Sequence, residues 1–90
     1  MKTIRKEASA GFAATNDALV TVSPQGGQGV TVELTSSVQH QFGEYLVAFV
    51  ESAVRSAGHQ GVRVKVIDKG AWDYALKARV VTALTRGEAL

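Results

Sequence analysis

The chain has 90 residues and a mass of 9.5 kDa, which is enough for one domain with one small core. Hydrophobic residues make up 46% and cysteine is absent, which indicates a globular protein and excludes a disulfide scaffold, a thiolate site and a sulfur-ligated metal. The net charge is +2, but three cations lie within the first six residues, so the basicity belongs to the N-terminus.

Residues 1–9 are expected to be a flexible leader, with a short strand near residues 4–8. A basic arm of this kind can bind nucleic acid, but a frayed end is the ordinary interpretation, and we expect no nucleic-acid partner. No apolar run approaches the roughly 18 residues that a membrane span needs, and the basic residues are not followed by the apolar segment of a signal peptide. We therefore expect a cytoplasmic protein with no membrane partner.

The next segments predict a turn, two strands and a loop between them. Residues 10–17 are small and turn-like and end in an Asn-Asp pair, which tolerates left-handed backbone geometry. Residues 18–22 are rich in β-branched side chains, and residues 30–34 alternate with their apolar side chains inward. Residues 23–29 contain one proline and three glycines, which predicts a loop. The two flanking strands are expected to form an antiparallel hairpin.

Two helices and a third strand complete the chain. Ser36 or Ser37 is expected to cap a helix that Gly58 ends. Residues 62–66 alternate strictly between valines and cations, so one face of the sheet is expected to lie against the core and the other against water. Residues 71–84 predict the second helix. The buried stripe expected for the first helix comprises Val38, Phe42, Tyr45, Leu46, Phe49, Val50, Ala53 and Ala57. The buried stripe expected for the second comprises Trp72, Ala75, Leu76, Val80, Ala83 and Leu84.

The element order predicts a single α+β domain over residues 1–90. Its architecture is a two-layer sandwich, in which a small mixed β-sheet carries two helices on one face in the order ββαβα. The third strand is expected to run parallel to the second and antiparallel to the first, with the first strand in the middle of the sheet.

Candidate catalytic residues are few. His40 and His59 have no motif around them and are interpreted as solvated. The glycines of residues 26–29 join a strand to a strand, whereas a phosphate-binding loop leads into a helix. Turn formation and helix capping explain the acids Asp17, Asp68 and Asp73. We expect neither a catalytic nor a metal site. The classes of function that remain are a carrier and an interaction module with an accessible hydroxyl.

Three blocks of sequence resemble the citrate lyase gamma chain, which is the acyl carrier protein of the citrate lyase complex. Residues 36–43 (SSVQHQFG) resemble its Ser-Ser-Val-x-x-Gln-Phe-Gly segment. Residues 68–73 (DKGAWD) and 76–79 (LKAR) resemble its Asp-Lys-Gly-Ala-Leu-Asp/Glu and Leu-Arg-Ala-Arg segments. Residues 10–17 (AGFAATND) lie where the family has Ala-Gly-Thr-Leu-Glu-Ser-Ser/Gly-Asp. The order and spacing of these blocks match over residues 8–86.

The resemblance implies a non-catalytic carrier subunit of a lyase complex. The family carries 2'-(5''-phosphoribosyl)-3'-dephospho-CoA on a serine through a phosphodiester, which makes it a phosphoprotein. The thiol of that group holds acetyl and citryl thioesters while citrate is cleaved to acetate and oxaloacetate in citrate fermentation. The implied partners are the alpha and beta subunits and a prosthetic-group transferase. Tethering raises the effective concentration of the thioester at its partner enzymes.

The family's modified serine falls on Thr15 of this sequence, and the acid that follows the site is kept as Asp17. Arg79 is implied as a ligand of the cofactor's phosphates or of a partner carboxylate. The alternative for these residues is that Thr15 and Asp17 only shape a turn and that Arg79 is a solvated cation on the edge of a helix. Phe42 is expected in the core, and Trp72, which replaces the family's leucine, is expected to be a packing difference.

Two other functions remain open from the sequence. One is the carrier subunit of a related complex, such as citramalate lyase or malonate decarboxylase. The other is an unmodified interaction domain that has lost the attachment serine.

Overall fold

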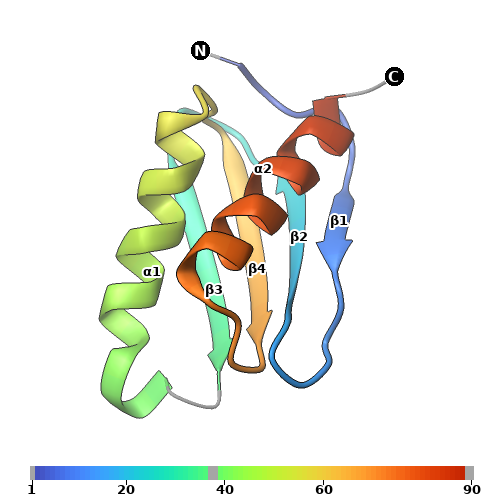
Figure 1. Cartoon of the computed structure of the whole chain (residues 1–90). Helices are drawn as coiled ribbons and strands as arrows, with labels where there is room; N and C mark the ends of the chain where they lie inside the picture. The colour runs from blue at the N-terminus through green and yellow to red at the C-terminus, as the bar shows by residue number, and fades with distance from the viewer. Residues whose placement is uncertain (1, 37–38, 89–90) are drawn as a thin grey trace.

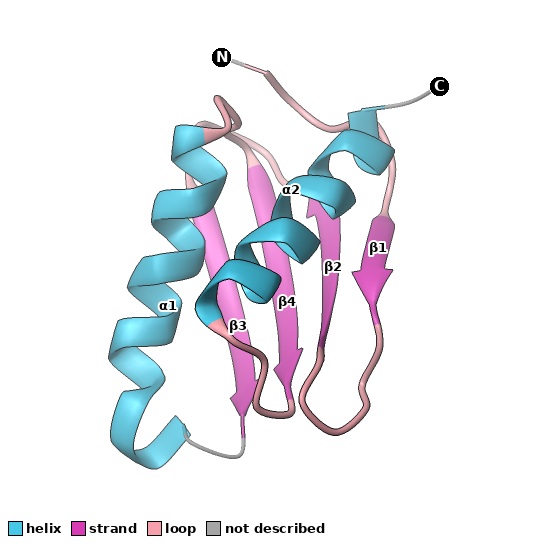
Figure 2. Ribbon diagram, viewed as in Figure 1, coloured by secondary structure: helices cyan, strands magenta, loops and turns pink. Residues whose placement is uncertain are grey.

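The computed structural model describes residues 2–36 and 39–88. Its elements in chain order are β1 (Ala8–Gly11), β2 (Ala18–Pro24), β3 (Val30–Ser36), α1 (Gln39–Ser56), β4 (Val62–Asp68) and α2 (Asp73–Glu88). The four strands form one sheet in the order β1-β2-β4-β3, and both helices cover the same face of it (Figures 1 and 2). The predicted two-layer α+β architecture is therefore confirmed.

The sheet is mixed, as the sequence predicts. β4 runs parallel to β3, with Val62 opposite Val30, and antiparallel to β2, with Val20 opposite Val66. β2 also pairs antiparallel with β1 and so lies in the interior of the sheet, where it was expected. β1 is the additional strand: it begins at Ala8 rather than near residue 4 and extends into the segment predicted to be a turn.

The predicted antiparallel hairpin of residues 18–22 and 30–34 is wrong, because β4 lies between those two strands. The intervening loop wraps around the start of β4 instead. Gln25 N–H donates to the carbonyl of Gly61, and Gly61 N–H donates to the carbonyl of Gly29, at 2.8 and 2.9 Å. A Cβ on Gly61 would lie 2.8 Å from the carbonyl oxygen of Gly27, so the close approach requires a glycine there.

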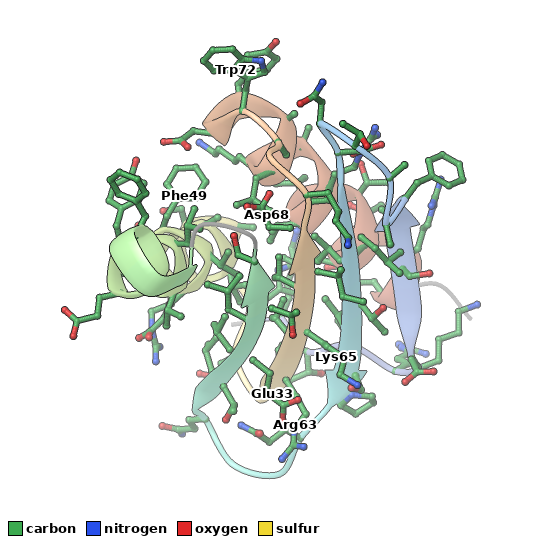
Figure 3. All side chains as sticks on the ribbon, turned by 90° about the horizontal axis from the view of Figure 1, so that it is seen from below. Glu33, Phe49, Arg63, Lys65, Asp68 and Trp72 are labelled. Carbon is green, nitrogen blue, oxygen red and sulfur yellow. The ribbon has the colours of Figure 1, made fainter. Side chains whose placement is uncertain are left out.

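β4 provides the centre of the core and confirms the predicted alternation. Val62, Val64 and Val66 are fully buried under the helices. Arg63 and Lys65 are exposed on the opposite face, together with Glu33 from β3 (Figure 3). The other fully buried large side chains are Val20, Val22, Val50, Val54, Leu76, Val80 and Leu84. The open face is thus polar, as is usual for a sheet with helices on one side only.

α1 ends as predicted, in a Schellman motif. Gly58 has φ +84°, its N–H donates to the carbonyl of Arg55, and His59 N–H donates to the carbonyl of Val54. This pair of bonds is the pattern that a left-handed residue at the end of a helix makes. At the other end, Ser37 and Val38 lie outside the described residues.

The predicted buried stripes are wrong for three aromatic residues. Phe42 and Tyr45 are 53% and 54% exposed, and Trp72 is 71% exposed. Phe42 and Tyr45 belong to the first turns of α1 and Trp72 precedes the first residue of α2. α1 begins at the end of the sheet (Figure 1), and the Trp72 side chain projects away from the sheet (Figure 3), so these rings are not covered by the core.

The segment of residues 2–9, expected to be a flexible leader, is tied to the rest of the fold by Ile4 and by backbone hydrogen bonds, while most of its side chains are exposed. Ile4 is 5% exposed and belongs to the core. The N–H of Lys2 donates to the carbonyl of Gly58, and the N–H of Arg5 donates to the carbonyl of Gly87. Backbone hydrogen bonds to the ends of both helices therefore anchor the segment at the end of the sheet opposite to the exposed aromatic residues (Figure 1).

Candidate functional site

The site begins with the turn that joins β1 to β2, residues 12–17, which we call the Thr15 turn. Asn16 has φ +64°, the left-handed geometry that the Asn-Asp pair predicts. Asp17 N–H donates to the carbonyl of Ala14 at 2.9 Å and closes the turn. Thr15 is exposed, and so are its neighbours Ala13, Ala14 and Asn16. The Thr15 hydroxyl is therefore carried on a tight turn between small or short side chains.

Backbone hydrogen bonds tie the Thr15 turn to the connection between β4 and α2. Asn16 N–H donates to the carbonyl of Lys69 at 2.8 Å, and Lys69 N–H donates to the carbonyl of Asp17 at 2.9 Å. The two connections lie side by side at the same end of the sheet (Figure 1). Both bonds of Lys69 lie directly beyond the last β2–β4 partners, Ala18 and Asp68, so the turn is held to the β4–α2 connection as well as by its own hydrogen bond.

Asp68 organises the connection between β4 and α2. It is 3% exposed, and its Oδ1 accepts hydrogen bonds from the N–H groups of Gly70 and Ala71 at 3.2 and 3.0 Å. Its Oδ2 accepts a hydrogen bond from the Ser36 hydroxyl at 2.8 Å. The predicted strand-to-helix turn at Asp68–Gly70 is confirmed. Two of the sequence blocks that carry the family resemblance, one at Ser36 and one at Asp68, thus meet through this carboxylate.

Asp17 and Arg79, both predicted as site residues, form a bidentate ion pair. Nε of Arg79 donates to Oδ1 of Asp17, and Nη2 donates to Oδ2, each at 3.2 Å. The N–H of Ala18 also donates to Oδ1, at 2.7 Å. The Arg79 donors, followed by the Ala18 N–H, hold the pKa of Asp17 below its usual value. The partner carboxylate of Arg79 in this structure is therefore one of the chain's own.

Gly11 makes room for that pair. It has φ +87°, and a Cβ there would lie 2.0 Å from the carbonyl oxygen of Ala18 and 2.9 Å from Cδ of Arg79. Only a residue without a side chain fits between the end of β1, the start of β2 and the Arg79 stem. This steric requirement explains the glycine of the Ala-Gly dipeptide that the chain shares with the family.

A second feature lies on the other side of the Asp68 connection. It is a groove of about 360 Å³ between the start of α1 and the start of α2, which we call the aromatic groove. Its lining residues are Phe42, Tyr45, Leu46, Asp68, Gly70, Ala71, Trp72 and Asp73. The Tyr45 hydroxyl donates to the Asp73 carboxylate and bridges the two helices, which raises the pKa of Tyr45. The Tyr45 ring also stacks on Phe49.

The sequence reasoning missed the aromatic groove because helical periodicity assigned its rings to the core. Two features of the sequence could have indicated the groove. The rings cluster at the starts of their helices, and Trp72 stands where the family has a leucine. Figure 3 shows Trp72 projecting away from the sheet, whereas Asp68 lies between the layers. The groove is therefore an exposed feature rather than part of the core.

His59 does not form a catalytic arrangement with these residues. His59 is 3% exposed, so the expectation of a solvated side chain is wrong for it. Its Nε2 lies 2.8 Å from Oε1 of Glu88, at the end of the sheet opposite to the Thr15 turn. His40 belongs to the part of α1 whose side chains are not described.

Two other kinds of feature, a metal-binding cluster and a membrane-spanning helix, are absent from residues 2–36 and 39–88. Within these ranges, no group of three or more His, Cys, Asp or Glu residues is arranged to hold a metal ion. No helix there has the length and apolarity needed to cross a membrane. The candidate site therefore consists of the exposed Thr15 hydroxyl on a hydrogen-bonded turn and the neighbouring aromatic groove.

Comparisons with known proteins show the family to which the chain belongs. Residues 5–87 match the model of a family described as "ACP: Malonate decarboxylase delta subunit (MdcD)". A citrate lyase acyl carrier protein from Streptococcus mutans is 41% identical, over 92% of this chain and 81% of its own length. One from Halothermothrix orenii is 39% identical, over 92% of this chain and 87% of its own length.

A solved structure supports the fold alone. A chain in the crystal structure of a Pseudomonas malonate decarboxylase hetero-tetramer in complex with malonate superimposes with a TM-score of 0.73. It is 17% identical, and the match covers 91% of this chain and 84% of that one. The family model and the curated relatives confirm the resemblance seen in the sequence: the chain belongs to the acyl carrier protein family of citrate lyase and malonate decarboxylase.

Proposed function

We propose that this chain is the acyl carrier subunit of a citrate lyase complex and that the Thr15 hydroxyl is its attachment point. Membership of an acyl carrier family implies a covalently attached prosthetic group, and the chain contains no cysteine that could carry a thioester itself. The attached group, 2'-(5''-phosphoribosyl)-3'-dephospho-CoA, would supply the thiol that holds the acetyl or citryl residue.

One observation supports the assignment above the others: Thr15 is exposed on a turn whose backbone is fixed. The reciprocal hydrogen bonds between the Thr15 turn and Lys69 hold the segment on the sheet. Its neighbours Ala13 and Ala14 leave space around the hydroxyl for a bulky phosphodiester. The residues present therefore fit the group, although the β-methyl of threonine crowds the oxygen more than serine would.

Asp17 and Arg79 have a positioning role in this proposal. Their bidentate pair joins the Thr15 turn to the middle of α2. The two donors of Arg79 that face the turn are engaged by the carboxylate, which favours a role in holding the turn over a role in binding the cofactor's phosphates. The same pair would present the hydroxyl in one orientation to a prosthetic-group transferase.

The chain itself performs no bond chemistry in this proposal. It tethers the thioester, and the alpha and beta subunits of the complex act on it in the cytoplasm. Tethering replaces a bimolecular encounter by a local search at high effective concentration. The curated relatives at 39–41% identity are citrate lyase carriers, which favours citrate over malonate as the acid handled. A malonate decarboxylase carrier is the second candidate, because the matching family model bears that description.

Intact mass measurement tests the attachment. The chain is co-expressed with the transferase and the genes that make the cofactor precursor, and its mass is expected to rise by that of one phosphoribosyl-dephospho-CoA group. Thr15→Ala should abolish the shift, whereas Thr82→Ala, which removes another exposed threonine hydroxyl, should leave it intact. An unshifted wild-type mass, or a Thr15→Ala chain that is still loaded, would overturn the assignment.

A further inference from the structure

The aromatic groove has properties that the attachment site alone does not explain. Trp72 is 71% exposed, and Phe42 and Tyr45 are more than half exposed, around a hollow of about 360 Å³. That size lies at the lower end of the range for small-molecule pockets. Single exposed apolar residues are ordinary on a protein surface, but a contiguous group of rings around a hollow usually marks a binding site.

The charges of the groove indicate which chemistry it accepts. Its two charged lining residues are the carboxylates Asp68 and Asp73, and no described lysine or arginine is among the residues that form it. Phosphates and the carboxylates of a citryl group would be repelled there. A neutral, flat, aromatic group with hydrogen-bond donors is favoured, because it can stack on the exposed rings and donate to the exposed carboxylate of Asp73.

The groove is continuous with the Thr15 turn. Gly70 lines the groove. It also lies next to Asn16 of the Thr15 turn: a Cβ placed on Gly70 would be 3.6 Å from Oδ1 of Asn16. Lys69, one residue earlier, shares the reciprocal backbone bonds with Asn16 and Asp17. A group attached at Thr15 therefore starts beside one wall of the groove, and Trp72 stands two residues beyond Gly70.

We propose that the aromatic groove is the resting site of the adenine base of the nucleotide carried on Thr15, with Trp72 as the ring on which the base stacks. This inference rests on the proposed function for the identity of the attached group. Adenine is the flat, neutral part of that group and carries an exocyclic amine that can donate a hydrogen bond. The phosphates of the nucleotide would stay outside the aromatic groove. Docking the base would leave the thiol-bearing arm to extend from the chain toward a partner enzyme.

The first test uses the unloaded protein and free ligands, so it does not depend on attachment. Trp72 is the only tryptophan, so one indole emission and one indole N–H resonance report on the groove. Adenosine and 3'-dephospho-CoA are expected to quench the emission and shift the resonance, with dissociation constants in the millimolar range. Pantetheine, which lacks the base, is expected to do neither.

A pair of variants assigns the binding to the groove. Phe42→Ala removes a lining ring and should weaken adenosine binding at least about fivefold, the lower limit expected for loss of one aromatic contact to a base. Tyr74→Ala removes a ring that is 76% exposed but outside the groove, and should leave the affinity unchanged. No response to adenosine, equal effects of the two variants, or a response to pantetheine alone would overturn the proposal.

The second test compares loaded and unloaded chains, separated by intact mass. Loading is expected to quench Trp72 without added ligand, and Phe42→Ala in the loaded chain should restore much of the emission. Absence of the mass shift refutes the attachment at Thr15, and the free-ligand titration still decides whether the groove binds adenine. A full mass shift with an unchanged indole signal refutes the resting site while leaving the attachment intact.

Discussion

Arg79 in the middle of α2 reaches across the end of β1 to bind Asp17 in the Thr15 turn, although the two residues are 62 positions apart. The planar guanidinium meets both carboxylate oxygens, which is the geometry in which arginine is a more specific partner than lysine. The contact joins the turn that carries the hydroxyl to the helix that covers β1 and β2. The orientation of the turn therefore depends on tertiary packing as well as on its own hydrogen bonds.

The pair makes stability depend on pH in a defined direction. Because Arg79 and the Ala18 N–H lower the pKa of Asp17 below its ordinary value of 3.8, the folded state binds the proton more weakly than the unfolded state. The contribution is complete above pH 3.8 and is lost as the pH falls through the lower, folded-state value. We expect Asp17→Asn to unfold more easily than the wild type at pH 7, with the difference narrowing below pH 3.8.

Denaturant unfolding of both proteins at several pH values measures this difference. Glu51→Gln is the control, because Glu51 pairs with Arg55 on the exposed side of α1 and such pairs contribute little. A wild-type advantage over Asp17→Asn that stays constant from neutral pH down to well below pH 3.8 would contradict the coupling between the Asp17 charge and folding.

Gly11 is expected to be the least replaceable glycine of the site. Gly11→Ala places a Cβ 2.0 Å from the carbonyl oxygen of Ala18, in a backbone conformation with φ +87°. We expect a loss of at least about 2 kcal/mol in the free energy of unfolding from strain and displacement of Arg79. Gly26→Ala is the matched control, since nothing lies within 4 Å of its Cβ position. Equal midpoints for the two variants in a denaturant titration would rule out this steric role.

Local physics explains which parts of the fold were predictable. The strict alternation of residues 62–66 fixes which side of β4 is buried, because side chains alternate across a strand. The Asn-Asp pair similarly predicts the left-handed geometry at Asn16. Strand pairing is a non-local property: the Gly-rich loop after Pro24 is equally compatible with a hairpin and with the observed path around Gly61.

The site shows the same division. Thr15 and Asp17 are found by resemblance, because they lie in one short block of sequence. The pairing of Asp17 with Arg79 depends on how α2 crosses the sheet, which periodicity does not specify. The rings of Phe42 and Trp72 fit a helical stripe in sequence, but they are 53% and 71% exposed in the structure. Whether an apolar residue is buried thus depends on how its helix packs against the sheet, which periodicity does not specify.

The packing of the N-terminal segment gives a third prediction. Ile4 is 5% exposed and packs against Gly87. A Cβ placed on Gly87 would lie 3.2 Å from both Cβ and Cγ2 of Ile4. Ile4→Ala is expected to cost about 2–4 kcal/mol of unfolding free energy, as for other large-to-small core substitutions. Lys6→Ala, on the exposed side of the same segment, should stay within about 0.5 kcal/mol of the wild type. Thermal and denaturant unfolding of both variants measure this, and an Ile4→Ala chain as stable as Lys6→Ala would mean that the segment contributes nothing to the core.

The methyl group of Thr15 gives the last prediction. The turn, the exposure and the Asp17–Arg79 pair are set by other residues, so Thr15→Ser should keep the fold and remove only the crowding around the oxygen. We expect the transferase to load Thr15→Ser roughly tenfold faster than the wild type, which corresponds to about 1.4 kcal/mol of activation free energy. Time-resolved intact mass with the transferase at limiting concentration measures the rate. Arg79→Gln separates crowding from turn orientation, because it leaves the threonine in place and should slow loading by releasing the turn. Loading of Thr15→Ser that is slower than that of the wild type would show that the transferase uses the methyl group as a contact, and the crowding argument would then be wrong.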